Sequence, residues 1–159
     1  MTKPTVIIDT REQRPWSFAG SGFTMVRRKL ETADYSVEGY EGHFAIERKG
    51  GVAEVAGNLV DKDGRFRREL ERLQSYPHAH VIFEFALEDL YAYPHGAGIP
   101  RSRMSQIRAR GPYLGKLLVD LMFLYPSIHW HFAGPRGEKL AVALIKRFLQ
   151  EQEQEQNCA

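Results

Sequence analysis

Apolar residues recur along the chain with two different periods, which separate predicted strands from predicted helices. Short runs that are β-branched, aromatic or alternating in polarity predict strands. They cover residues 4–10, 23–30, 35–37, 43–47, 79–85 and 127–132. Turns and short loops separate the first four runs, so we expect the early strands to pair as an antiparallel sheet.

Apolar residues spaced three or four apart predict the helices. These cover residues 52–59, 65–76, 87–93, 112–125 and a last helix that Gly134-Pro135 introduces and that runs to Leu149. Residues 94–110 are rich in Gly, Pro and Arg and are expected to form a surface loop or short helix. Strands come first and then alternate with helices, which indicates an α/β sandwich with a central mixed sheet between helices.

The length of 159 residues suits a single domain, which we place at residues 1–150. Residues 151–156 alternate Glu and Gln and offer nothing to pack, so we expect residues 151–159 to form a polar, disordered tail. No apolar run approaches bilayer length, and the only cysteine is Cys158. We therefore expect a protein that does not bind a membrane. We also expect it to work in the reducing interior of the cell, in the cytoplasm or associated with the nucleoid.

The net charge of +2 hides a more basic body, because residues 151–159 hold three glutamates and no base. Bases gather at residues 27–29, at residues 65–72 and at residues 101–110. Any one such cluster is most often a solvated face, but three together favour a polyanionic partner such as DNA.

Acidic residues follow the predicted strands at three places, as Asp9, as Asp34 and as Glu47 in the triplet Glu47-Arg48-Lys49. Residues two apart in a strand share a face, so Glu47 and Lys49 are expected to point to the same side. Hydrolysis of a phosphodiester calls for a divalent cation held by carboxylate and carbonyl oxygens. Asp34 and Glu47 are the natural pair, with Asp9 and the Arg48 carbonyl as further ligands and Lys49 beside the attacking water.

Structural alternatives exist for each of these patterns. A single Glu47–Lys49 pair on a strand is more often an exposed ion pair than a catalytic one, and only the three acids after predicted strands reverse that preference. Two histidine pairs with zinc-like spacing lack a third ligand, so packing is the favoured interpretation. They are His78 with His80 and His129 with His131.

The chain resembles the nuclease domain of the XPF family, the branch of the PD-(D/E)xK restriction-endonuclease-like superfamily whose hallmark is GDxnERKxxxD. The resemblance covers residues from about 5 to about 149. The matching segments are Ile8-Asp9-Thr10-Arg11-Glu12-Gln13, Ala33-Asp34-Tyr35, Glu47-Arg48-Lys49, Gly57-Asn58-Leu59, Gly64-Arg65-Phe66 and Val81-Ile82-Phe83-Glu84-Phe85. The triplet together with the flanking segments makes the match more specific than an isolated acid–lysine motif.

The resemblance implies a restriction-endonuclease-like α/β/α sandwich and a site built on the matched positions. Asp9, Asp34 and Glu47 would bind Mg²⁺, with Mn²⁺ as an alternative, and Asp34, Glu47 and Lys49 would be catalytic. Arg11, Glu12 and Arg48 would support the site. The basic ridge on the second helix would hold DNA, through Arg65, Arg68 and Arg72.

Two positions depart from the family pattern. The glycine before the motif aspartate is Ala33, and the acidic residue that the family carries after three further residues beyond the triplet is replaced by Ala53. Glu54 follows immediately, and we expect it to substitute in a supporting role.

The resulting hypothesis is a Mg²⁺-dependent DNA endonuclease that acts on branched, flapped or nicked DNA without sequence specificity. DNA and a second copy of the chain, as a homodimer, are the expected partners, and no small-molecule cofactor is expected. One alternative is a catalytically silent DNA-binding or scaffold subunit with the same fold. Another is a junction resolvase or exonuclease.

Overall fold

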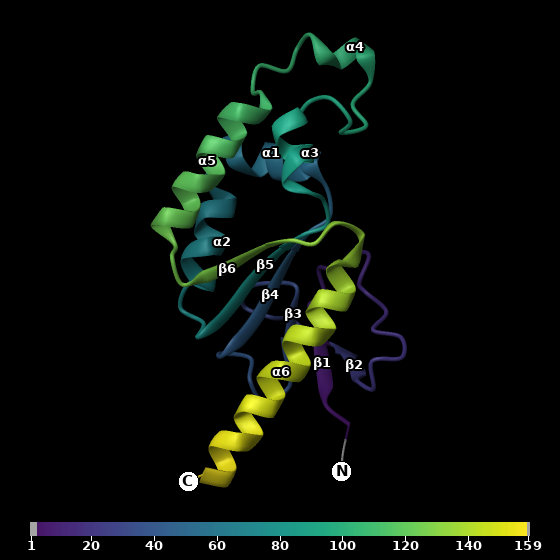
Figure 1. Cartoon of the computed structure of the whole chain (residues 1–159), viewed down its shortest axis with the longest axis vertical. Coiled ribbons are helices and arrows are strands. Elements are labelled where there is room, and N and C mark those ends of the chain that lie inside the picture. Colours follow the sequence, from purple (N-terminus) through teal and green to yellow (C-terminus); the bar gives the residue numbers. More distant parts are fainter. Residues whose placement is uncertain (1–2, 159) are drawn as a thin grey trace.

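A six-stranded mixed sheet runs through the centre of the computed structural model, which describes residues 3–158 (Figure 1). Across the sheet the strand order is β2-β1-β3-β4-β5-β6. The strands are β1 (Thr5–Ile8), β2 (Thr24–Arg27), β3 (Tyr35–Val37), β4 (Phe44–Lys49), β5 (His78–Phe83) and β6 (Ile128–Phe132). β4 and β5 lie inside the sheet and are buried along most of their length, as their apolar sequences predict.

The first two strands pair in parallel, with Thr5 opposite Thr24 and Ile8 opposite Arg27. The prediction of an entirely antiparallel early sheet is therefore wrong for this pair, although β3 is antiparallel to both β1 and β4. The physical reason is the length of the connection between β1 and β2. Residues 9–23 are enough to return the chain to the same end of the sheet, whereas an antiparallel hairpin needs only a few.

Helices cover both faces of the sheet (Figure 1). They are α1 (Val52–Val60), α2 (Arg65–Leu73), α3 (Leu87–Ala92), α4 (Arg101–Met104), α5 (Gly111–Leu124) and α6 (Gly137–Cys158), with a 3-10 turn, η1 (Gly134–Arg136), before the last. One apolar cluster joins α1, α2, α3 and α5 to one face of the sheet, and a second joins α6 to the other. This layering confirms the predicted α/β/α sandwich.

Alternation along β4 assigns its side chains to the two layers. Phe44 and Ile46 pack in the α6 layer, while Ala45 packs in the layer of α1 and α2. By the same period, Glu47 and Lys49 point toward α1 and α2, and Arg48 points to the opposite face. This one strand therefore presents charged residues to both sides of the sheet.

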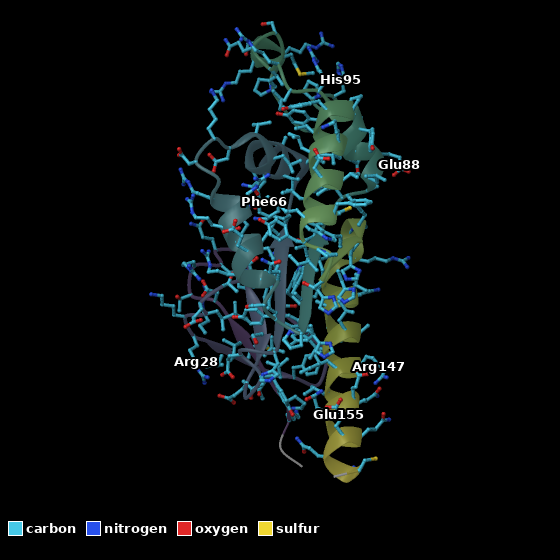
Figure 2. The ribbon with its side chains drawn as sticks, turned by 90° about the vertical axis from the view of Figure 1, so that its left-hand side faces the viewer. Arg28, Phe66, Glu88, His95, Arg147 and Glu155 are labelled. Carbon is cyan, nitrogen blue, oxygen red and sulfur yellow. The ribbon has the colours of Figure 1, made fainter. Side chains whose placement is uncertain are left out.

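The C-terminal segment differs from its prediction. Of residues 151–159, expected to be a disordered tail, residues 151–158 continue α6 as helix to Cys158, and Ala159 lies outside the described residues. Glu and Gln are good helix formers, and a helix that is already nucleated extends at little cost. Arg147 and Glu151 also pair one turn apart, with 3.6 Å between Nη2 and Oε1. Arg147 and Glu155 lie exposed along this helix (Figure 2).

Residues 94–110 form the expected surface loop, which contains the four-residue helix α4 and projects at one end of the molecule (Figure 1). None of the helices described for residues 3–158 has both the length and the apolarity that a bilayer crossing would require.

Candidate active site

The triplet at the end of β4 forms the centre of a buried charged cluster. Glu47 and Lys49 are 8% and 5% exposed, and 3.0 Å separates Glu47 Oε1 from Lys49 Nζ. The two side chains share one face of the sheet, as the two-residue period predicts. The structural alternative was an exposed ion pair on the surface of a strand, and the burial of both side chains does not agree with it.

Asp34 reaches the same place from the segment before β3. Its backbone N–H donates to the Ile46 carbonyl over 3.0 Å, and its Oδ2 accepts from the Arg48 N–H at 2.8 Å. Ala33, which takes the place of the family glycine, adopts a φ of 68°, a left-handed conformation that favours glycine. The position keeps that conformation without glycine, and the Asp34 carboxylate stays next to the end of β4.

Burial and neighbouring carboxylates raise the pKa of both Asp34 and Glu47. For Asp34, burial is the main cause of a raised pKa, and the Glu12 and Glu69 carboxylates add to it. For Glu47, burial again raises the pKa most, followed by the charge of Asp34. Two acids that are costly to ionise side by side are stabilised by a cation placed between them.

Lys49 is surrounded by acidic side chains and keeps its proton. Its Nζ lies 3.6 Å from Glu69 Oε2 and 3.8 Å from Glu54 Oε1, in addition to Glu47, and 4.8 Å from the centre of the Phe66 ring. Burial alone would lower the pKa of Lys49, but the charges of Glu47 and Glu69 outweigh it, so the pKa is raised. The lysine therefore acts as a fixed cation and hydrogen-bond donor.

Glu69 is the site residue that the sequence prediction missed. It lies on α2, one turn after the buried Phe66 and one turn before Leu73, on the side of the helix that faces the sheet. A signal was present, because residues 66, 69 and 73 follow the helical period inward. The basic pattern of the same helix drew attention to its other face.

Asp9 is buried and engaged within its own loop. Oδ1 accepts from the backbone N–H and Nε of Arg11 at 2.9 and 2.7 Å, and Oδ2 accepts from the Leu30 N–H at 2.7 Å and Arg11 Nη2 at 3.2 Å. Burial raises the pKa of Asp9, but these hydrogen bonds outweigh it and the pKa is lowered. The predicted ligand is thus an ionised carboxylate whose four contacts shape the loop beside the cluster.

Arg48 contacts acidic and aromatic side chains on the opposite face of the sheet. Its Nε donates to Glu84 Oε1, its Nη1 lies 3.9 Å from Glu12 Oε2, and its guanidinium carbon lies 4.9 Å from the Trp16 ring centre. Trp16 in turn stacks on Tyr35 with 4.7 Å between ring centres. Arg48 and Glu12 therefore join the loop after β1 to the ends of β4 and β5, and Trp16 belongs to the packing.

Two clefts open beside the cluster. The larger, of about 470 Å³, is lined by the predicted residues Arg11, Glu12, Asp34, Glu47, Arg48 and Glu54. The smaller, of about 160 Å³, is lined by Asp9, Asp34, Glu47, Glu69 and Arg72. Asp34 and Glu47 line both, which places them at the junction where a phosphate group could approach the acids.

Glu54 lies at the rim of the larger cleft. Its Oε2 accepts from the Gly50 N–H at 3.1 Å, and its Oε1 faces Lys49. Ala53, at the motif position, is exposed. Glu54 thus brings a carboxylate to the site from the position next to the missing acid, and its role as a substitute for that acid stays a prediction.

The predicted DNA-contacting arginines all lie exposed on α2. Arg65 lies 3.7 Å from Asp63 through its Nη2, and Arg68 donates to the Asp63 carbonyl. Only Arg72 lines a cleft that also contains the acids. The ridge therefore approaches the cluster at its Arg72 end.

The histidines lie apart from this cluster and pack with one another in the α6 layer. His80 Nδ1 lies 3.1 Å from His131 Nε2, and the His80 ring stacks on that of His129. Among residues 3–158, no group of three or more His, Cys, Asp or Glu side chains is arranged to hold a metal ion by itself. Mg²⁺ does not need such a cage, because it commonly binds one or two carboxylates and completes its shell with water and substrate phosphate.

Comparison with known proteins identifies related folds. The family model described as the ERCC4 domain matches residues 8–133. The structure of XPF from Aeropyrum pernix aligns with a TM-score of 0.62 and 23% identity over 90% of this chain and 60% of that one. The same protein in a structure titled as a complex with DNA aligns with a TM-score of 0.63 and 23% identity, over 94% of this chain and 66% of that one. The chain thus spans less than two thirds of these relatives, and no curated protein matches it.

Proposed function

Because this chain belongs to the ERCC4 domain family and carries an XPF-type nuclease domain, we propose that it is a metal-dependent endonuclease that hydrolyses phosphodiester bonds in DNA. One observation carries the proposal. The half-buried Asp34 and the buried Glu47 and Lys49, from two separate segments, meet at the open end of β4 beside clefts lined by further acids and arginines. A purely structural role gives no reason to bury so many charges together.

Asp34 and Glu47 fit a divalent cation. Among the residues described, Asp34 Oδ1 and Glu47 Oε2 have no hydrogen-bond partner, while the other oxygen of each carboxylate is held by Arg48 or Lys49. Each acid is therefore oriented and still has one oxygen available. The predicted third ligand, Asp9, would have to share an oxygen with Arg11. When bound, Mg²⁺ or Mn²⁺ would offset the charge that develops on the phosphate.

Lys49 supplies the second element of the chemistry. As a cation held by Glu47 and Glu69, its ammonium can orient a water molecule toward phosphorus and stabilise negative charge in the transition state. Because the lysine is already charged, it does not take the proton of the water, and a neighbouring carboxylate would act as the base.

Positively charged side chains around the clefts would position the DNA backbone. Of the three ridge arginines, Arg72 lines the smaller cleft together with the acids, and Arg65 and Arg68 extend the ridge along α2. Contacts to phosphate carry no sequence information, so the proposed substrate is recognised by structure, as a branch, flap or nick. Arg11, Glu12, Arg48 and Glu54 would keep the walls of the site in place.

We also propose that the active form is a homodimer that pairs through α5. Phe123 is 85% exposed, and Tyr113, Val119 and Leu124 are exposed on the same helix. Large apolar side chains that remain uncovered over one helix are typical of a surface that binds another protein chain.

The test of the nuclease proposal is cleavage of labelled flap, nicked, four-way and linear duplex DNA in Mg²⁺, in Mn²⁺ and in EDTA. We expect internal cuts with either metal, none in EDTA, and loss of cleavage in Asp34→Asn with DNA binding kept. Glu88→Gln removes an exposed acid on α3 (Figure 2) and serves as the matched control. Binding without products in any condition would favour the silent scaffold, and products from DNA ends alone would favour an exonuclease.

A further inference from the structure

We propose that residues 94–110, here called the arginine arm, form a second DNA contact that binds the phosphate backbone of the duplex flanking the cut. The arm contains α4 and projects beyond the helical layer at the end of the molecule (Figure 1). The inference rests on the proposed action on DNA. The second contact lies away from the acids and from α2. Two contacts at different places would fix the direction in which the duplex leaves the site.

The charge of the arm is uncompensated. Its four arginines are Arg101, Arg103, Arg108 and Arg110. All four are exposed, and no side chain among them takes part in an ion pair or hydrogen bond within residues 3–158. From residue 90 to residue 119 the chain holds no acid at all. By contrast, Arg28 and Arg65 are each paired with two acids. Four free guanidinium groups on one short segment form a strong anion-binding surface.

The base of the arm is held in a fixed place. Gly111 donates its N–H to the Tyr93 carbonyl over 3.0 Å, which closes the two ends of the arm on each other. A Cβ at Gly111 would lie 1.9 Å from the Tyr91 carbonyl oxygen, and one at Gly115 would lie 2.6 Å from Cζ of the Tyr91 ring. The clash with backbone requires glycine at Gly111, and the contact at Gly115 shows how closely α5 packs against the Tyr91 ring on α3. The arm therefore presents its arginines from a rigid root.

Helix α1 connects the arm to the acidic cluster. It starts beside the cluster, where Glu54 faces Lys49, and its far end, at Val60, lines a groove together with Ile107 and Arg108. A helix of nine residues is about 13 Å long at 1.5 Å per residue. Since B-DNA rises about 3.4 Å per base pair, the arm is expected to meet the duplex at least about four base pairs from the cut.

The exposed groups of the arm suit phosphate rather than a lipid bilayer. Its larger apolar residues, Ile99, Met104 and Ile107, are half-buried and leave no apolar anchor on the surface. Arginine side chains without such an anchor bind a phosphate backbone through charge and hydrogen bonds. DNA is therefore the partner that these observations favour.

The test compares two variants that each lose four exposed bases. One is Arg101→Ala/Arg103→Ala/Arg108→Ala/Arg110→Ala in the arm. The control changes Arg136, Lys139, Lys146 and Arg147 to Ala, near and on α6 in the opposite layer. Binding is measured in EDTA by fluorescence anisotropy, on nicked DNA whose duplex flank is lengthened stepwise from two to sixteen base pairs, at several salt concentrations.

For the unchanged protein and the control, affinity should rise once the flank passes about four base pairs. The arm variant should lose that rise, bind long flanks at least about tenfold more weakly, and show a salt slope smaller by roughly two to four. A variant with four lysines instead should keep most of the affinity, because a point charge still binds phosphate. Circular dichroism checks that each variant is folded.

Equal loss in the control would overturn the proposal, since net charge alone would then explain the effect. An unchanged flank dependence in the arm variant, a lysine variant as weak as the alanine one, or tighter arm-dependent binding to anionic phospholipid vesicles than to DNA would also overturn it. Because binding is measured without metal, the arm contact can stand if cleavage is never observed. Conversely, cleavage can be observed with no effect of the arm.

Discussion

The contribution of His80 to stability should become unfavourable below pH 6.5, because the fold buries this residue in its neutral form. Burial is the main cause that lowers the pKa of His80 to about 3, and the neighbouring His131, His129 and His78 lower it further. The rest of its surroundings, including Phe44, is apolar. The unfolded chain binds this proton near pH 6.5 and the folded chain does not, so the unfolded state holds more protons and is favoured as the pH falls.

The magnitude follows from the distance between the pH and the unfolded pKa. Each pH unit below 6.5 costs about 1.4 kcal/mol until the folded pKa is reached, so His80 should lower the free energy of unfolding by about 2 kcal/mol at pH 5. At pH 8 the residue is neutral in both states and the cost disappears. The perturbation that isolates this effect is His80→Leu, which removes the titrating group and keeps a side chain of similar bulk.

The assay is urea unfolding at constant ionic strength between pH 5 and pH 8 for both proteins. Asp34 and Glu47 have raised pKa values and act in the opposite direction, losing stability as the pH rises. The informative quantity is therefore the difference between the unfolding free energies of the two proteins at each pH. That difference should shift by about 2 kcal/mol in favour of His80→Leu from pH 8 to pH 5. Parallel curves would refute the reasoning.

Two further predictions concern the site and the pairing surface. Glu69→Gln should lower kcat about tenfold, because Lys49 loses one of its orienting acids, while DNA binding measured by anisotropy stays within about twofold. The control is Glu71→Gln, which removes an exposed acid on the same helix. Equal kcat values for the two variants would contradict this role of Glu69. Phe123→Asp should leave the unfolding free energy within about 0.5 kcal/mol and shift sedimentation from dimer to monomer; a protein that is already monomeric at high concentration would remove the homodimer.

The local sequence pattern was sufficient to predict features that depend on a single strand or helix. The shared face of Glu47 and Lys49 follows from the period of a single strand, and the inward side of α2 follows from Phe66 and Leu70. The sandwich itself follows from the order of strands and helices. The first two predictions need only residues that are neighbours along the chain, and the third needs only the order of the elements.

Other features required the folded molecule. The pairing of β1 with β2 depends on the path of residues 9–23, and the helical end of α6 depends on a helix already nucleated upstream. The hydrogen bonds that occupy both oxygens of the Asp9 carboxylate are not signalled by any local sequence pattern. The ion pair between Arg48 and Glu84 is not signalled by one either.

By itself, the sequence determined which residue types stand at the ends of the strands, and hence that two acids and a lysine would be presented together at the end of β4. Only the tertiary structure decided which other charges surround them. Glu69 reaches Lys49 because α2 packs on the sheet. The base of the arginine arm has a fixed position because Gly111 and Gly115 pack closely against Tyr91. Side-chain direction within an element is set by backbone geometry, whereas contacts between elements are set by packing over the whole chain.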